Sequence, residues 1–167
     1  MPIEAFAASP TAVPYLDSAT TASVTAFADT LIPRTDTPGA QDAGVPGVFD
    51  ALMRDWATPE HRGQFLGALK AIDSASVARN GKPLATLPRP ERTKFLQAYD
   101  AEQFAAPADP LGSKTMYLQL KELIVSLYYL SEPGATIELR YEQVPGAWEA
   151  SIPITAETRA WAGANVG

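Results

Sequence analysis

Apolar residues recur at helical spacing in five stretches of the chain, and each stretch predicts one amphipathic helix. Pro33 ends the first stripe, because proline lacks a backbone N–H and disfavours helical angles in the residue before it. Ile32 is therefore expected to be the last or nearly the last residue of this helix, and Ser18 or Thr20 can cap its start. The stripe comprises Val24, Phe27, Ala28, Leu31 and Ile32.

Proline and glycine mark the boundaries of the next two predicted helices. Pro46 suits the first turn of the second helix, where its missing N–H costs nothing. In the third helix, Thr58 is the expected N-cap, Pro59 the first helical residue, and Asn80-Gly81 the end. The second apolar face comprises Val45, Val48, Phe49, Leu52, Met53 and Trp56, and the third comprises Phe65, Leu66, Leu69 and Ile72.

Two further helices follow a connection rich in proline. Pro90 can open the fourth helix, and Ser113 is the expected cap of the fifth. The fifth helix has the strongest period and is expected to be the central helix of the core. The fourth face comprises Phe95, Leu96 and Tyr99, and the fifth comprises Met116, Tyr117, Leu120, Leu123, Ile124, Leu127 and Tyr128.

Both ends of the chain lack a helical period. Residues 1–17 contain three prolines and are expected to form an extended arm outside the core. At Pro133-Gly134 a proline stop meets a glycine able to take a left-handed angle, and no helical stripe resumes beyond it. The sequence thus predicts one all-α domain of about five helices, residues 18–134, with an irregular Pro-rich arm and an extended tail, residues 135–167.

The large aromatic residues of this tail are expected to be buried against a protein surface. Tyr141, Trp148 and Trp161 have no helical period that could bury them, so they must lie on this domain or on another chain.

The connection between the first two helices, residues 33–46, is called the corner below. Thr37-Pro38-Gly39 has the chemistry of a tight turn, in which Gly39 is free to take a positive φ, and Gly44 gives a second permissive point. Since helical apolar faces flank the corner on both sides, its shape is expected to be fixed.

Three carboxylates and one guanidinium, Asp29, Asp36, Asp42 and Arg34, lie in or beside the corner. One interpretation is a cation or ligand site, although the spacing matches no oxygen-rich calcium loop. The other is structural: Asp36 and Asp42 accept hydrogen bonds from N–H groups of the loop, and Arg34 ties the loop down.

Composition and charge argue against several classes of partner and site. The chain has 167 residues and a net charge of −6, which argues against nucleic acid as a partner. It has no cysteine, so this chain supplies no thiolate ligand and no covalent haem attachment. There is also no apolar run long enough to span a bilayer.

Few residues suggest catalysis. The single histidine, His61, falls at a helix start, where exposure is expected, and no nucleophile elbow or nucleotide-binding loop is present. Tyr128 and Tyr129 point to different sides of a helix, so at least one faces away from the core. A tyrosine there can bond a loop carbonyl through its hydroxyl or contact a ligand. Apolar and aromatic surface without catalytic groups favours a binding role.

Two blocks of sequence resemble the signatures of the gluconate 2-dehydrogenase subunit 3 family. The first is ADTLIPRTDTPGAQDAGVP, residues 28–46. The second spans residues 118–148 and includes LKEL, YYLSEPG, LRY and VPGAW. The blocks lie near opposite ends of the chain, so the resemblance covers nearly all of it.

The resemblance implies a small subunit without catalytic, cofactor or metal residues of its own. Its partner would be the large FAD-containing subunit of a sugar or polyol dehydrogenase of the glucose-methanol-choline oxidoreductase class. A cytochrome c subunit with several haems often completes such complexes.

Location also follows only from the resemblance, which implies a periplasmic complex exported with a twin-arginine signal. The start of this sequence shows no Arg-Arg pair and no apolar segment. Either the signal has been removed or this member works in the cytoplasm.

We expect the arm, the corner and the tail to wrap the large subunit and stabilise it. The residues predicted at this interface are Pro33, Arg34, Asp36, Pro38, Tyr129, Tyr141, Trp148 and Trp161. One alternative is a stand-alone ligand-binding protein or enzyme that uses Asp29, Arg34, Asp36 and His61; another is an export chaperone that leaves after delivery.

Overall fold

The computed structural model describes residues 13–105, 115–140, 151 and 153–161. These residues form five α-helices and two short helical turns: α1 (Ser18–Leu31), α2 (Val45–Asp55), α3 (Pro59–Asn80), η2 (Leu84–Thr86), α4 (Arg89–Ala105), α5 (Met116–Tyr129) and η3 (Gly134–Glu138). In this part of the chain the only β pairing is an isolated bridge between Arg140 and Trp161. The predicted all-α fold of about five helices is confirmed.

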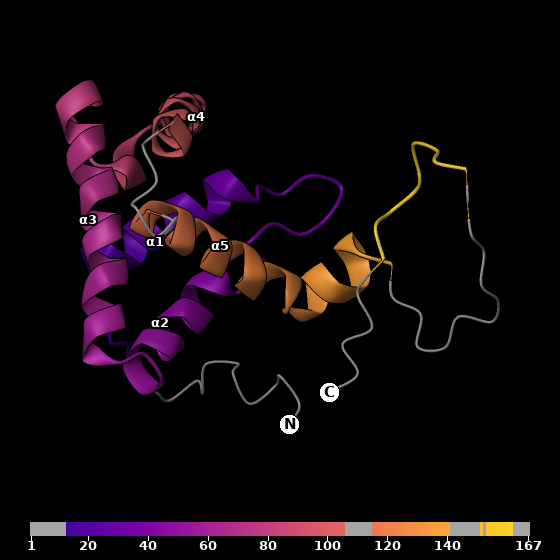
Figure 1. Cartoon of the computed structure of the whole chain (residues 1–167), viewed down its shortest axis with the longest axis horizontal. Coiled ribbons are helices and arrows are strands. Elements are labelled where there is room, and N and C mark those ends of the chain that lie inside the picture. Colours follow the sequence, from indigo (N-terminus) through magenta and orange to yellow (C-terminus); the bar gives the residue numbers. More distant parts are fainter. Residues whose placement is uncertain (1–12, 106–114, 141–150, 152, 162–167) are drawn as a thin grey trace.

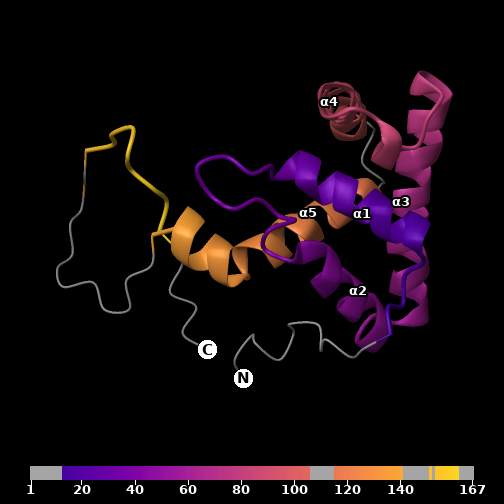
Figure 2. The ribbon, with the colours of Figure 1, turned by 180° about the vertical axis from the view of Figure 1, so that it is seen from behind.

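Helix α5 passes through the middle of the helical part (Figure 1). It packs against α2 and α3, while α1 contacts α2, α3, α4 and η2. Seen from behind, α1 lies in front of α5, and α3 stands along one side of the domain (Figure 2). Four residues of the apolar face predicted for α5 are buried, with Leu120 and Ile124 at 0% exposure, and Met116, Leu123 and Leu127 pack partly buried against the core.

Side-chain caps fix where the helices start. Asp17 caps α1 by accepting the Thr20 amide at 2.7 Å, so the expectation of Ser18 or Thr20 as the cap is wrong. Thr58 caps α3 as predicted. Thr115 caps α5, so Ser113 is not the cap of this helix. Each cap satisfies one of the amides that the first helical turn leaves without a partner.

Aromatic rings join α1, α4 and α5. The Tyr117 ring meets the edges of Phe27 and Tyr99, with ring centroids 6.0 and 5.1 Å apart. The Tyr117 hydroxyl donates to the Asp100 carboxylate at 3.0 Å, and Lys121 donates to the same oxygen at 2.6 Å. Burial raises the pKa of Tyr117, and its bond to Asp100 raises it further. Its polar end is therefore satisfied inside the core.

The described end of the N-terminal arm is fixed to α2. The amides of Tyr15 and Leu16 donate to the Asp50 carboxylate at 3.0 and 2.7 Å, and the guanidinium of Arg62 covers the Tyr15 ring. Leu16 is buried. The expectation that the arm lies outside the core is wrong at this residue.

Two predictions at helix ends are wrong. Trp56 is the C-cap of α2 and its residue is 69% exposed, so it is not part of the buried face. Beyond Pro133 the chain forms the π-helical turn η3, although the sequence shows no apolar stripe there. Among the described helices, none combines the length and apolarity needed to cross a membrane.

Candidate functional site

The corner is closed by hydrogen bonds to its own backbone. The Ala40 amide donates to the Ile32 carbonyl at 2.9 Å, directly after α1 ends. Asp42 accepts the Gly39 amide at 2.9 Å and the Arg34 Nε at 2.8 Å. The Arg34 guanidinium and the Gly39 amide lower the pKa of Asp42. The structural role predicted for Arg34 and Asp42 is confirmed.

Gly39 is required for space and not for its backbone angle. Its φ is not positive, so that part of the prediction is wrong. A Cβ atom at this position would lie 2.5 Å from the Arg34 amide nitrogen and 2.8 Å from the Ile32 carbonyl oxygen. Two backbone segments therefore approach each other here more closely than any side chain allows. Gly44 is the residue of the corner with a positive φ, 71°, as the N-cap of α2.

Tyr128, at the end of α5, holds the corner through its hydroxyl group. Its hydroxyl donates to the Pro38 carbonyl at 2.7 Å, across 90 positions of sequence. The residue is 1% exposed, whereas Tyr129 is 40% exposed, so the prediction that at least one of the two tyrosines faces away from the core is confirmed. Burial raises the pKa of Tyr128, and the nearby Glu138 carboxylate adds to the shift. The hydroxyl thus remains a hydrogen-bond donor.

Gly134 lets η3 turn tightly against the end of α5. It is buried, and its φ is not positive, so the predicted left-handed angle is wrong. A Cβ atom here would lie 2.0 Å from the Tyr128 carbonyl oxygen. The same carbonyl accepts the Ser131 amide and hydroxyl. Gly134 therefore sits directly behind the residue that holds the corner.

Two side chains that the sequence did not single out, Glu138 and Arg159, connect the corner to η3 and to the tail. The Thr37 hydroxyl donates to Glu138, 101 positions away. Arg159 donates to Asp36 at 2.9 Å, across 123 positions. Hydrogen bonds from Thr35, from the amide of Asp36 and from Arg159 lower the pKa of Asp36. No local pattern marks these partners, because each pair forms only when the folded chain brings the corner against η3 or the tail.

The charged residues near the corner form separate ion pairs and not one pocket. Asp29 pairs with Arg92 at 2.7 Å and with Arg89 at 3.5 Å, on α4. The other two carboxylates have the cationic partners described above. His61 lies in the first turn of α3, where its amide donates to Thr58. Within the described residues, no group of three or more His, Cys, Asp or Glu side chains could hold a metal ion.

The described members of the predicted interface gather around the corner. Pro33 and Pro38 are half-buried, and the Arg34 and Asp36 side chains are 67% and 77% exposed. Trp161 stacks under the Arg140 guanidinium at 4.2 Å. Tyr141 and Trp148 lie outside the described residues. Whether these residues contact a partner stays a prediction.

Large apolar side chains remain exposed on the same part of the domain. Ile137 and Trp161 line one groove between η3 and the tail. We call the group the apolar end surface: Tyr129 (40% exposed), Leu130 (51%), Ile137 (49%), Ile154 (87%) and Trp161 (43%). Large apolar side chains left exposed on the elements beside a rigid corner are candidates for a protein interface.

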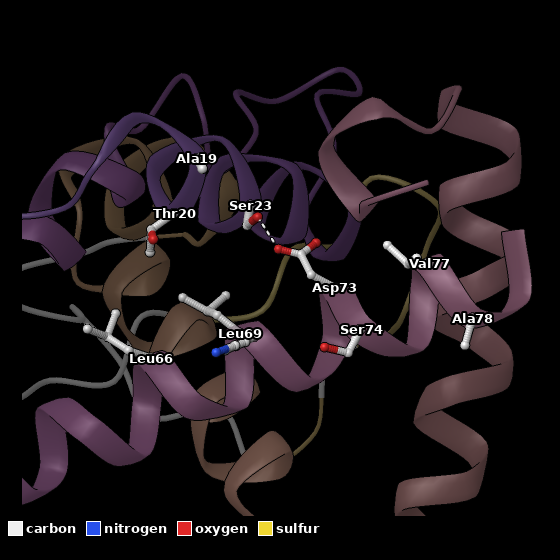
Figure 3. A pocket seen from close by; sticks show the side chains of 10 residues that line it. Ala19, Thr20, Ser23, Leu66, Leu69, Asp73, Ser74, Val77 and Ala78 are labelled. Atoms are coloured by element: carbon white, nitrogen blue, oxygen red, sulfur yellow. Dashed lines mark hydrogen bonds between the residues drawn. The ribbon is translucent and has the colours of Figure 1, made fainter. Parts of the chain in front are cut away.

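A second groove, of about 590 Å³, lies between α1 and α3. Asp73 crosses it: one carboxylate oxygen accepts the Ser23 hydroxyl (Figure 3), and the other accepts the Leu84 amide at 3.0 Å. Leu66 and Leu69 form its apolar wall. The groove is thus held by a carboxylate that ties α1 and η2 to α3.

Replacing Asp73 by Ala is expected to destabilise the domain by about 2 kcal/mol, because the amide of buried Leu84 and the hydroxyl of buried Ser23 lose their acceptor. Urea unfolding followed by circular dichroism measures the change. Ser74→Ala, an exposed neighbour on the same groove, serves as the control and should stay within about 0.5 kcal/mol of the unchanged protein. Equal stability of the two variants would contradict the role assigned to Asp73.

Comparison with known proteins gave one match. A family model described as gluconate 2-dehydrogenase subunit 3 matches residues 19–146. The match includes the corner, Tyr128, Gly134 and Glu138, and it ends before Arg159. No curated protein and no solved structure matched.

Proposed function

Because the chain belongs to the gluconate 2-dehydrogenase subunit 3 family, we propose that it is a small, non-catalytic subunit that binds and stabilises the large FAD-containing subunit of a dehydrogenase. The large subunit would be a glucose-methanol-choline type flavoprotein that oxidises a sugar or polyol. This chain would bind no cofactor of its own.

The observation that carries the proposal is the apolar end surface beside the corner. Its five side chains are each at least 40% exposed, although the core of the domain is well filled. The corner beside it has a fixed shape, because Tyr128 donates a hydrogen bond to its Pro38 carbonyl and Asp42 accepts one from its Gly39 amide. A rigid, partly apolar surface binds a partner with little loss of conformational entropy.

The electrostatics also favour binding over chemistry. Asp29, Asp36 and Asp42 each pair with an arginine of the same chain. At Asp36 and Asp42 these contacts lower the pKa of the carboxyl group, which makes each a poor general base. The corner therefore supports a role in shape and contact.

Three finer parts of the proposal come from the family. FAD would be held by the large subunit, a cytochrome c subunit would accept its electrons, and the complex would be periplasmic. A cytoplasmic location is the alternative.

The test is recovery of the tagged chain from its native host, with the absorption spectrum and the masses of the eluted proteins. We expect a stoichiometric partner several times larger with a flavin spectrum. Leu130→Ser, on the apolar end surface, should lower recovery of that partner about tenfold, the effect of losing about 1.4 kcal/mol of binding.

Val77→Ser is the matched control, since Val77 is 45% exposed but lies on α3. It should leave recovery of the partner unchanged. A folded, colourless chain that elutes alone would contradict the proposal. Equal losses in both variants would show that the apolar end surface is not the interface.

A further inference from the structure

The tail segment of residues 153–161 contacts the end of η3 and the corner without burying any of its own residues. Every residue in it is exposed, including Ile154 at 87% and Trp161 at 43%. Figure 1 shows part of this segment as a yellow loop that extends away from the helices. Apolar burial therefore does not hold it in place.

Charged and polar contacts hold the segment instead, and most of them pass through Arg159. Its guanidinium donates to the Asp36 carboxylate at 2.9 Å and to the Glu138 backbone carbonyl at 3.4 Å. The Glu138 carboxylate lies 3.9 Å from the same guanidinium. One side chain of the tail thus bridges the corner and η3.

A second contact lies next to Arg159. The Arg140 amide donates to the Ala160 carbonyl at 2.8 Å, and among the described residues this is the one backbone hydrogen bond between residues 153–161 and the rest of the chain. The Arg140 guanidinium stacks over the Trp161 ring. The Arg140 amide therefore reports directly on whether the tail is attached.

We propose that residues 153–161 form a strap that exists in an attached and a released state, with Arg159 as its clasp. Exposed ion pairs and exposed cation–π contacts are weak, and salt screens them. Release therefore occurs without unfolding of the helices. In the attached state, the strap completes the surface beside the corner and fixes Ile154 and Trp161 there.

The use of the strap rests on the proposed function: the attached state would present a preorganised apolar surface to the large subunit. The attachment itself is a property of the isolated chain. It is therefore tested without the partner, and its failure is distinct from failure of the proposed function.

Hydrogen exchange of individual amides in the full chain tests the strap. In Arg159→Gln, or in the unchanged chain in 1 M NaCl, the Arg140 amide should exchange about fivefold faster, the effect of losing an exposed ion pair. The Leu130 amide, bonded to Ser126 at the end of α5, should keep its rate.

Arg79→Gln is the matched control, because Arg79 forms an exposed bidentate pair with Glu102 between α3 and α4. It should leave the Arg140 amide unchanged. An unchanged Arg140 rate in Arg159→Gln would overturn the proposal. So would equal acceleration of the Arg140 and Leu130 amides, because the end of α5 would then be opening together with the strap.

Discussion

Gly134→Ala is expected to destabilise the domain by about 3 kcal/mol, at the upper end of the usual cost of overpacking. The added methyl group would lie 2.0 Å from the Tyr128 carbonyl oxygen and 2.8 Å from its carbonyl carbon. Both atoms belong to the backbone, so no side chain can rotate away to make room. Either η3 or the last turn of α5 must move, and the bond from Tyr128 to Pro38 moves with it.

Pulse proteolysis in urea measures this loss at protein concentrations low enough to avoid aggregation. Gly47→Ala is the control, because nothing lies within 4 Å of a Cβ atom at this position in α2. Alanine favours the helix over glycine, so this control should be about 0.5–1 kcal/mol more stable than the unchanged protein. If the two alanine variants were equally stable, η3 would not pack against α5 as described.

Much of the fold could be predicted, because the helices depend on signals that are local in sequence. The period of the apolar residues, Pro33 after α1, and Thr58-Pro59 at the start of α3 identify elements by rules that act within one or two turns. Even here the caps of α1 and α5 were misplaced, since several polar residues near a helix start can serve equally well before the backbone is known.

Gly39 and Gly134 have roles that local sequence rules do not predict. The sequence marks Gly39 and Gly44 alike as permissive points, and only Gly44 uses the left-handed region. Gly39 is needed because the chain passes close to its own backbone at Arg34, and Gly134 because η3 passes close to Tyr128. A close approach between two segments depends on tertiary structure, so composition does not reveal it.

The candidate site shows the same difference between local sequence signals and contacts that depend on the tertiary structure. Most of the predicted interface residues lie in the two recognisable blocks, but the contacts that join the corner to η3 and to the tail, from Thr37 to Glu138 and from Asp36 to Arg159, span more than a hundred positions. Arg159 also falls outside the match to the family. The link between the tail and the corner is therefore visible only in the folded chain.

Two variants of Tyr128 should separate the stability that its buried ring contributes from the stability that its hydrogen bond to the corner contributes. Tyr128→Phe keeps the buried ring but leaves the Pro38 carbonyl without this donor, which is expected to cost about 1–2 kcal/mol of folding free energy. Tyr128→Ala also opens a cavity where the residue is 1% exposed, and should cost about 3–5 kcal/mol. Urea unfolding of both variants gives the two values.

Tyr129→Phe controls for the loss of a hydroxyl group at the neighbouring residue, which is 40% exposed, and should change stability by less than about 0.5 kcal/mol. The Ala40 amide, which closes the corner on Ile32, should exchange faster in Tyr128→Phe than in Tyr129→Phe. Faster exchange would show that Tyr128 fixes the shape of the corner. Equal exchange would mean that the corner keeps its shape through Asp42 and Arg34, and that Tyr128 contributes only to the core.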